Sequence, residues 1–181
     1  MKNEQMMSKE EDLRAFCIGD CVIYRAEGIC DVVDIRRETF IGRTEALEYY
    51  ILSPRNDPNS TFYVPVANEE LVALMRPLLA REEILALCDE LRDARMDWIV
   101  ESRARNVKFR EILSIGDRRQ VLVLVNTVKE RIAENEKIGK KPGSTDSGAL
   151  RRGAKLLRDE FSAAMDISCD EELFALLDGK E

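Results

Sequence analysis

The sequence of 181 residues contains no histidine. Histidine is the commonest general base in enzymes, so its absence excludes Ser-His-Asp and Cys-His catalytic arrangements. The carboxylates are scattered along helical patterns and form no recognisable acid–base pair. The one basic stretch that contains glycine, IGKKPGST at 138–145, lacks the G-x-x-x-x-G-K-[ST] spacing of a phosphate-binding loop. We therefore predict a protein that is not an enzyme and that uses no cofactor.

Long apolar runs are also missing. No stretch of 18 apolar residues occurs, which excludes a membrane-spanning helix of ordinary length. The first residues, MKNEQMMSKEEDLRA, lack the apolar segment of a secretory signal peptide. We expect a cytoplasmic protein without membrane contact, in which the cysteines remain reduced.

Cysteine is present but not in a metal-binding pattern. Cys17, Cys21 and Cys30 are four and nine residues apart, whereas Cys88 and Cys169 are distant in the chain. A structural zinc site usually takes four ligands in paired short spacings such as C-x2-C. The spacing therefore predicts no metal site, and it favours small buried apolar side chains in strands.

Charge is unevenly distributed along the chain. Residues 1–90 carry 10 Lys and Arg against 18 Asp and Glu, residues 91–160 carry 17 against 11, and residues 161–181 carry 1 against 6. The net charge of −7 therefore hides a basic central segment between two acidic ones. Such a segment is suited to nucleic-acid phosphates, although arginine-rich surface helices also occur for solubility alone.

Short strand patterns dominate the first half of the chain. An alternating run at 21–25 and a β-branched run at 29–37 flank Glu27-Gly28, which is typical of a hairpin turn. A second bend is expected at 39–43, followed by strands at 49–52 and 61–66 with a loop at 54–60 between them. Pro65 cannot donate to a strand ladder, so the last strand should lie at an edge or end there.

Helical periodicity replaces the strand pattern after residue 78. Four helices are predicted, at 80–94, 98–113, 119–137 and 148–165. SIGD at 114–117 separates the second from the third, and Ser168 with Glu171 predicts a capping box for a short terminal helix. The fold class is therefore α+β. We expect a flexible lead over 1–13, a small Tudor- or SH3-like β-barrel over 14–77, and an all-α domain over 78–181.

Several motifs, taken in order, resemble the CarD/CdnL family of bacterial transcription regulators. They are F-x-x-G-D-x-V-x-Y-x-x-x-G at 16–28, G-x-x-x-x-x-x-Y-Y-I-L at 42–52, V-P at 64–65, MRPLL-x-x-E-E-I at 75–84, W-x17-G-D at 98–117 and A-x-x-L-x-x-E-F at 154–161. The resemblance covers roughly residues 14 to 165 and rests on the order and spacing of the motifs together.

The resemblance implies two partners. In that family the N-terminal barrel is a Tudor-like domain that binds the RNA polymerase β subunit, and the helical domain contacts promoter DNA at the opening bubble. Ile51, Tyr63 and Pro65 fall where the family contacts the β subunit. Basic residues that some members carry near Glu38 and Tyr63 are absent here, so the ion pairs at this contact should differ. The protein is expected to act as a monomer that stabilises the open promoter complex.

On the DNA side, Trp98 matches the family's tryptophan that wedges against a splayed base pair. The next arginines, Arg103 and Arg105, follow only after Ile99-Val100-Glu101. If 98–113 is one helix, Trp98 shares a face with Arg105 and Phe109, as a core residue would. We predict DNA contacts from Trp98, Arg103, Arg105 and Arg110. Two alternatives remain: a Tudor-like adaptor that does not touch DNA, and an enzyme with an unrecognised carboxylate site.

Overall fold

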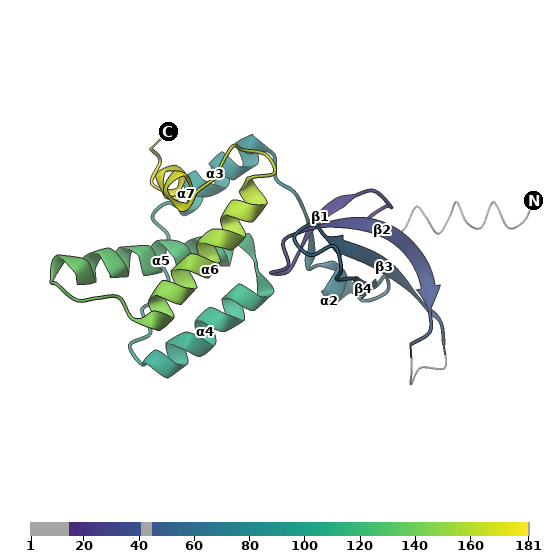
Figure 1. Ribbon diagram of the computed structural model, residues 1–181, viewed down its shortest axis with the longest axis horizontal. Coiled ribbons are helices and arrows are strands. Elements are labelled where there is room, and N and C mark those ends of the chain that lie inside the picture. The colour runs from purple at the N-terminus through teal and green to yellow at the C-terminus, as the bar shows by residue number, and fades with distance from the viewer. Residues whose placement is uncertain (1–14, 41–44, 181) are drawn as a thin grey trace, which may run out of the picture. The chain divides into compact units, whose positions relative to one another are not determined.

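A computed structural model describes residues 15–40 and 45–180, so the expected lead over 1–13 and part of the bend at 39–43 lie outside the described residues. The chain divides into two compact units, Met1–Pro77 and Leu78–Glu181. The first contains an antiparallel sheet and the second consists of helices, which confirms the α+β class (Figure 1).

Five strands form the sheet of the first unit, in the order β4-β3-β2-β1-β5. Their bounds are β1 Cys21–Tyr24, β2 Ile29–Glu38, β3 Leu47–Pro54, β4 Phe62–Pro65 and β5 Met75–Pro77. A short helix, α2 Glu69–Val72, separates β4 from β5, and neither α2 nor β5 is among the elements expected from the sequence. Because β4 and β5 are the two ends of the sheet and not neighbours, the predicted closed barrel is not confirmed.

The β1–β2 hairpin forms where the sequence predicts it. The turn places Arg25 and Gly28 at positive φ, 50° and 82°, and the Tyr24 N–H donates to the Gly28 carbonyl. Glycine adopts this backbone conformation without the steric penalty that a side chain brings. In β2 the register shifts between Val32 and Asp34, so Val33 lies on a bulge and is half exposed.

One face of the sheet carries the core of the first unit. Buried side chains from all five strands of the sheet pack together there: Val22, Tyr24, Cys30, Val32, Tyr50, Leu52, Val64 and Met75. The strand period of two residues therefore sends the alternate positions, including Ile51 and Tyr63, to the opposite face.

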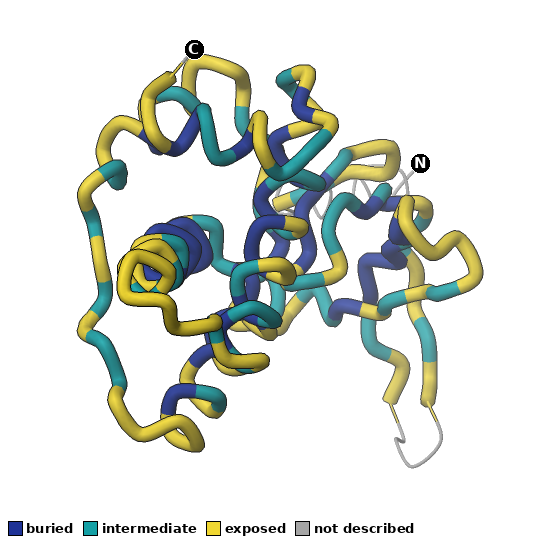
Figure 2. The backbone as a smooth tube through the Cα atoms, turned by 60° about the vertical axis from the view of Figure 1, so that its left-hand side comes forward, coloured by how far each residue is buried: buried dark blue, intermediate teal, exposed yellow. Residues whose placement is uncertain are grey.

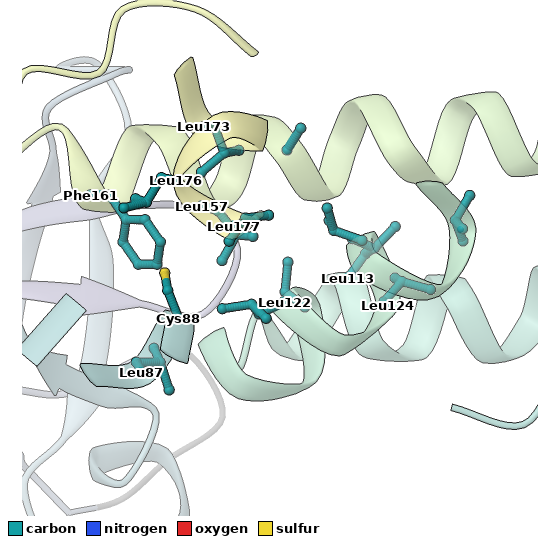
Figure 3. Close-up of a cluster of buried hydrophobic side chains, with 14 of the residues drawn as sticks. Leu87, Cys88, Leu113, Leu122, Leu124, Leu157, Phe161, Leu173, Leu176 and Leu177 are labelled. Atoms are coloured by element: carbon teal, nitrogen blue, oxygen red, sulfur yellow. The ribbon is translucent and has the colours of Figure 1, made fainter. Parts of the chain in front are cut away.

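Five helices build the second unit. They are α3 Arg81–Leu91, α4 Ser102–Ile115, α5 Arg118–Lys137, α6 Ser144–Phe161 and α7 Asp170–Leu177. Their buried sides face one another (Figure 2). The close-up of this core shows Cys88 of α3 directed toward the ring of Phe161 of α6 (Figure 3).

Glycine and acidic caps set the ends of these helices. Gly116 ends α4 in the left-handed conformation, and the Asp117 carboxylate then accepts from the Gln120 N–H to begin α5. This confirms the predicted break at 114–117. At the terminal helix the predicted Ser168–Glu171 capping box is wrong by one residue, because the Ser168 N–H and hydroxyl both donate to Glu172.

The predicted helix at 98–113 is wrong at its start. α4 begins only at Ser102, and residues 95–100 have no regular structure. The Arg105 guanidinium donates to the carbonyl oxygens of Ile99 and Val100, at 2.8 and 3.1 Å, so these carbonyls are used by a side chain. The Glu101 carboxylate caps the new N-terminus by accepting from the Arg103 and Ala104 N–H groups.

Candidate protein-binding edge and nucleic-acid interface

The strand β4 is an edge of the sheet. It is hydrogen-bonded to β3 and ends at Pro65, as the missing N–H of proline predicted. Its register pairs Tyr63 with Ile51 and Pro65 with Tyr49. Directly paired residues project from the same face of a sheet, so the three predicted polymerase contacts share the face opposite the core.

Three aromatic rings pack together on this face. The ring centroids of Phe40 and Tyr63 are 5.1 Å apart, those of Phe40 and Tyr49 are 5.3 Å apart, and all the pairs meet edge to face. Tyr49 is buried, whereas Phe40 is 41% and Tyr63 37% exposed. We call Phe40, Tyr49 and Tyr63 the aromatic cluster. Phe40 was not predicted as a contact residue, because the sequence places it in a bend. An aromatic residue next to a bend between two strands was the signal that could have identified it.

Ile51 is less accessible than the sequence suggested. Only 4% of its surface is exposed, and it is covered on the same face as Tyr63. Ile51 is therefore a buried neighbour of Tyr63 on the paired strand, and Tyr63 presents the exposed surface. Pro65 is intermediate in exposure and ends the strand beside Tyr49.

Charged side chains on β2 continue this face. Arg36 lies in register with Tyr49 and forms ion pairs with Glu38 at 2.6 Å and Asp34 at 3.1 Å. The hydrogen bond from Arg36 to Glu38 is the main reason that the pKa of Arg36 is raised above its ordinary value. The aromatic cluster is thus bordered by Arg36, whose charge is already paired with two carboxylates.

In the helical unit, Trp98 lies in the irregular segment before α4. Its ring is partly buried against the core of the unit, 6.4 Å from the ring of Phe109. The guanidinium carbons of Arg105 and Arg131 lie over the ring, 4.7 and 5.3 Å from its centroid. Trp98 does contact Phe109, but not for the predicted reason, because the two are not on one helix.

Arg105 is a buried structural residue. Only 9% of it is exposed, and its Nε lies 2.8 Å from a carboxylate oxygen of Asp146 in α6. The same guanidinium holds the Ile99 and Val100 carbonyls. With these partners occupied, Arg105 is not positioned to bind a phosphate, in contrast to the exposed Arg103 and Arg110.

Eleven arginines of the helical unit, those from Arg92 to Arg158, form two groups. One group forms ion pairs with carboxylates: Arg92, Arg95, Arg105, Arg118, Arg119, Arg131 and Arg158. A second group is exposed and has no carboxylate partner within residues 15–40 and 45–180: Arg103, Arg110, Arg151 and Arg152. We call these four the unpaired arginines. All of them lie on α4 and α6, which pack against each other (Figure 1).

A cavity of about 290 Å³ lies between α4 and α6. Its lining includes the buried apolar side chains of Phe109 and Leu113 and two of the unpaired arginines, Arg110 and Arg152. Arg110 is among the DNA contacts predicted from the sequence, whereas Arg152 is not, because nothing in the spacing along the chain shows that α6 returns beside α4.

The described part of the chain contains no group of three or more Cys, Asp or Glu side chains that could hold a metal ion. Cys30 is buried in a strand, as predicted, whereas Cys88 is buried in the helix α3, Cys17 is exposed, and Cys21 and Cys169 are intermediate. Burial is the main cause that raises the pKa of Cys30 to about 12 and that of Cys88 to about 11. Among the described helices, none is long and apolar enough to cross a membrane.

Comparison with known proteins finds a family match for the first unit. Residues 16–79 match the family model described as the CarD-like/TRCF RID domain. No curated protein matches the chain. The matched segment includes all five strands and therefore the whole β4 edge with its aromatic cluster. The resemblance drawn from the sequence motifs is thereby confirmed for this segment.

Proposed function

Because residues 16–79 form a domain of the CarD-like/TRCF RID family, we propose that this protein is a transcription regulator that binds the bacterial RNA polymerase β subunit through its sheet and stabilises the open promoter complex through DNA contacts of its helical unit. The family match is the observation that carries the polymerase contact. The Tudor-like form of the sheet and the absence of enzymatic activity are part of the same proposal.

Docking on the β subunit would use the β4 edge. An edge strand offers backbone groups to which a partner strand can add, and alternate side chains fix the register of that addition. Beside this edge, Tyr63 and Phe40 offer exposed aromatic surface that packs on the buried ring of Tyr49. Aromatic side chains of this kind contribute strongly to protein interfaces.

DNA contact would use the unpaired arginines. Arg103 and Arg110 are seven residues apart on α4 and so share one side of that helix, and Arg151 and Arg152 add two cations from α6. Because their guanidinium groups are not neutralised by carboxylates within the described residues, they can bind phosphates without first breaking an ion pair. The net charge of −7 opposes approach to DNA, so binding should depend on the polymerase holding the protein at the promoter.

Trp98 and Arg105 would support this interface. Arg105 fixes the segment before α4, and Trp98 packs beneath Arg105 and Arg131. A wedge role for Trp98 at the open bubble would require its ring to leave these cations. We therefore propose the arginines as the DNA contacts, and the wedge stays a prediction.

The lifetime of the open complex tests the DNA contact. The variant R103A/R110A/R151A/R152A should dissociate faster, and its lifetime should depend less on salt, because each phosphate that is no longer neutralised lowers the logarithmic salt slope by about 0.9. The control R92A/R95A/R119A/R158A removes the same charge from ion-paired positions. Equal lifetimes for the first variant and the parent would favour the adaptor that binds polymerase without touching DNA.

A further inference from the structure

The cavity between α4 and α6 is lined by many hydrogen-bond donors. Its wall carries hydrogen-bond donors from both helices: Asn106, Arg110, Ser144, Thr145 and Arg152. Among the described residues that line it, none carries a carboxylate. Such a wall is complementary to an anion with several acceptor oxygens.

Both arginines in the cavity lining are free to bind an anion. Arg110 and Arg152 are exposed and have no carboxylate partner in the part of the chain that the structure describes. The carboxylate of Asp146, two residues before Gly148 on the same helix, is buried and bound to Arg105, at 2.8 Å from its Nε. This acidic group is therefore already neutralised, so the two guanidinium groups keep their charge for a ligand.

The size of the cavity narrows the ligand class. At about 290 Å³ it lies just below the range of pockets that enclose drug-sized molecules. Guanidinium groups bind phosphate through two parallel hydrogen bonds, with a geometry that lysine cannot match. The apolar side chains of Phe109 and Leu113 in the lining suit the carbon atoms of an attached sugar.

We propose that this cavity is a phosphate clamp that holds one backbone phosphate of the promoter DNA between Arg110 and Arg152. The inference rests on the proposed function and deepens it. It divides the unpaired arginines into two roles: Arg110 and Arg152 grip a single phosphate, whereas Arg103 and Arg151 supply attraction outside the cavity.

The chain offers a matched pair of variants for the test. R110A/R152A and R103A/R151A each remove one arginine from α4 and one from α6, and only the first pair lines the cavity. A third variant, Gly148→Leu, keeps every charge. Gly148 lines the cavity and nothing lies within 4 Å of a Cβ added there, so a leucine side chain fits and should occupy the space of the ligand.

The full chain is first titrated with inorganic phosphate and followed by amide NMR shifts. We expect saturating shifts at Thr145 and Ala149 in the parent and in R103A/R151A, and their loss in R110A/R152A and in Gly148→Leu. The lifetime of the open promoter complex is then measured for the same variants. R110A/R152A should shorten it about fivefold or more, and R103A/R151A by less than about twofold.

Three results would overturn the clamp. If the parent shows no saturating shifts, the cavity does not bind phosphate. If both double variants shorten the lifetime equally, the arginines act as a diffuse charged surface, and the proposed DNA contact survives without a clamp. If R110A/R152A loses phosphate binding but keeps the parent lifetime, the ligand is a free phosphate compound and not DNA. The proposed DNA contact itself fails if the quadruple arginine variant also keeps the parent lifetime.

Discussion

The guanidinium of Arg105 on α4 lies 2.8 Å from the carboxylate of Asp146 on α6, and both side chains are about nine-tenths buried. Through Nη1, Arg105 also donates to two carbonyl oxygens of the segment that carries Trp98. This one side chain therefore joins α4, α6 and the irregular segment before α4.

Removing one member of this pair should destabilise the helical unit. Arg105→Ala leaves the Asp146 charge buried without its partner, and we expect the free energy of unfolding to fall by about 3–5 kcal/mol. Chemical unfolding followed by tryptophan fluorescence checks this, because the only tryptophan lies in the helical unit. Arg103→Ala is the control and should change the free energy by less than about 0.5 kcal/mol. Equal stability of the two variants would show that the buried pair is not structural.

Trp98→Ala separates packing from a wedge role. The ring is partly buried against the core and lies beneath two guanidinium groups, so we expect a loss of about 1–3 kcal/mol in unfolding free energy. Circular dichroism at 222 nm measures this loss in the absence of the fluorophore. A variant with unchanged stability and a shortened open-complex lifetime would instead support the wedge.

Gly153 sets the closeness of α5 and α6. A Cβ built at Gly153 would lie 2.7 Å from a methyl carbon of Val125, so Gly153→Ala should cost about 1–3 kcal/mol despite the higher helix propensity of alanine. Gly148 is the matched control on the same helix. Its added Cβ meets nothing within 4 Å, so Gly148→Ala should stabilise the protein by about 0.5–1 kcal/mol. Opposite signs in thermal unfolding confirm the prediction, and two stabilising changes would contradict it.

The buried cysteines predict a loss of stability in alkali. Burial raises the pKa of Cys30 to about 12 and of Cys88 to about 11, from an ordinary value of 9.0. Above pH 9 the unfolded chain releases these thiol protons before the folded chain does, so stability that is complete below pH 9 falls as pH rises toward 12. Urea unfolding between about pH 8 and 11 should show a smaller decline for Cys30→Ala and Cys88→Ala than for the parent. Cys17→Ser, at an exposed position, should keep the parent slope.

Much of the local structure follows from the sequence because local signals agree with tertiary packing. The hairpin around Gly28, the edge at Pro65 and the break at Gly116-Asp117 all form where backbone restrictions require them. The start of α4 could not be read in this way. The periodicity of 98–113 is helical, but the Ile99 and Val100 carbonyls accept hydrogen bonds from the Arg105 guanidinium and not from helix backbone N–H groups. The same guanidinium is held by Asp146, which lies 41 residues further along the chain.

The candidate sites show the same limit. Sequence alone could not tell that Arg105 is buried while Arg110 is exposed, because the difference depends on which carboxylate lies opposite each one. Arg152 belongs to the interface only because α6 lies beside α4. Likewise, Phe40 joins Tyr49 and Tyr63 through the pairing of β2, β3 and β4, which the sequence does not encode as a spacing.

The β4 face offers one position that can be changed without disturbing the sheet. Ile51→Arg would place a charge at a position that is 4% exposed and would damage the fold itself. Tyr63→Glu instead changes an exposed ring and should leave the fold intact. Val107→Glu, an exposed apolar position on α4, adds the same charge in the other unit and is the control.

Binding of the full-length chain to the isolated RNA polymerase β subunit, measured by calorimetry, tests the central claim most directly. We expect the parent and Val107→Glu to bind alike, and Tyr63→Glu to bind at least about tenfold more weakly, as for an aromatic side chain that anchors an interface. Absence of binding by the parent, or equal binding by all three proteins with the fold verified, would contradict docking through the β4 edge.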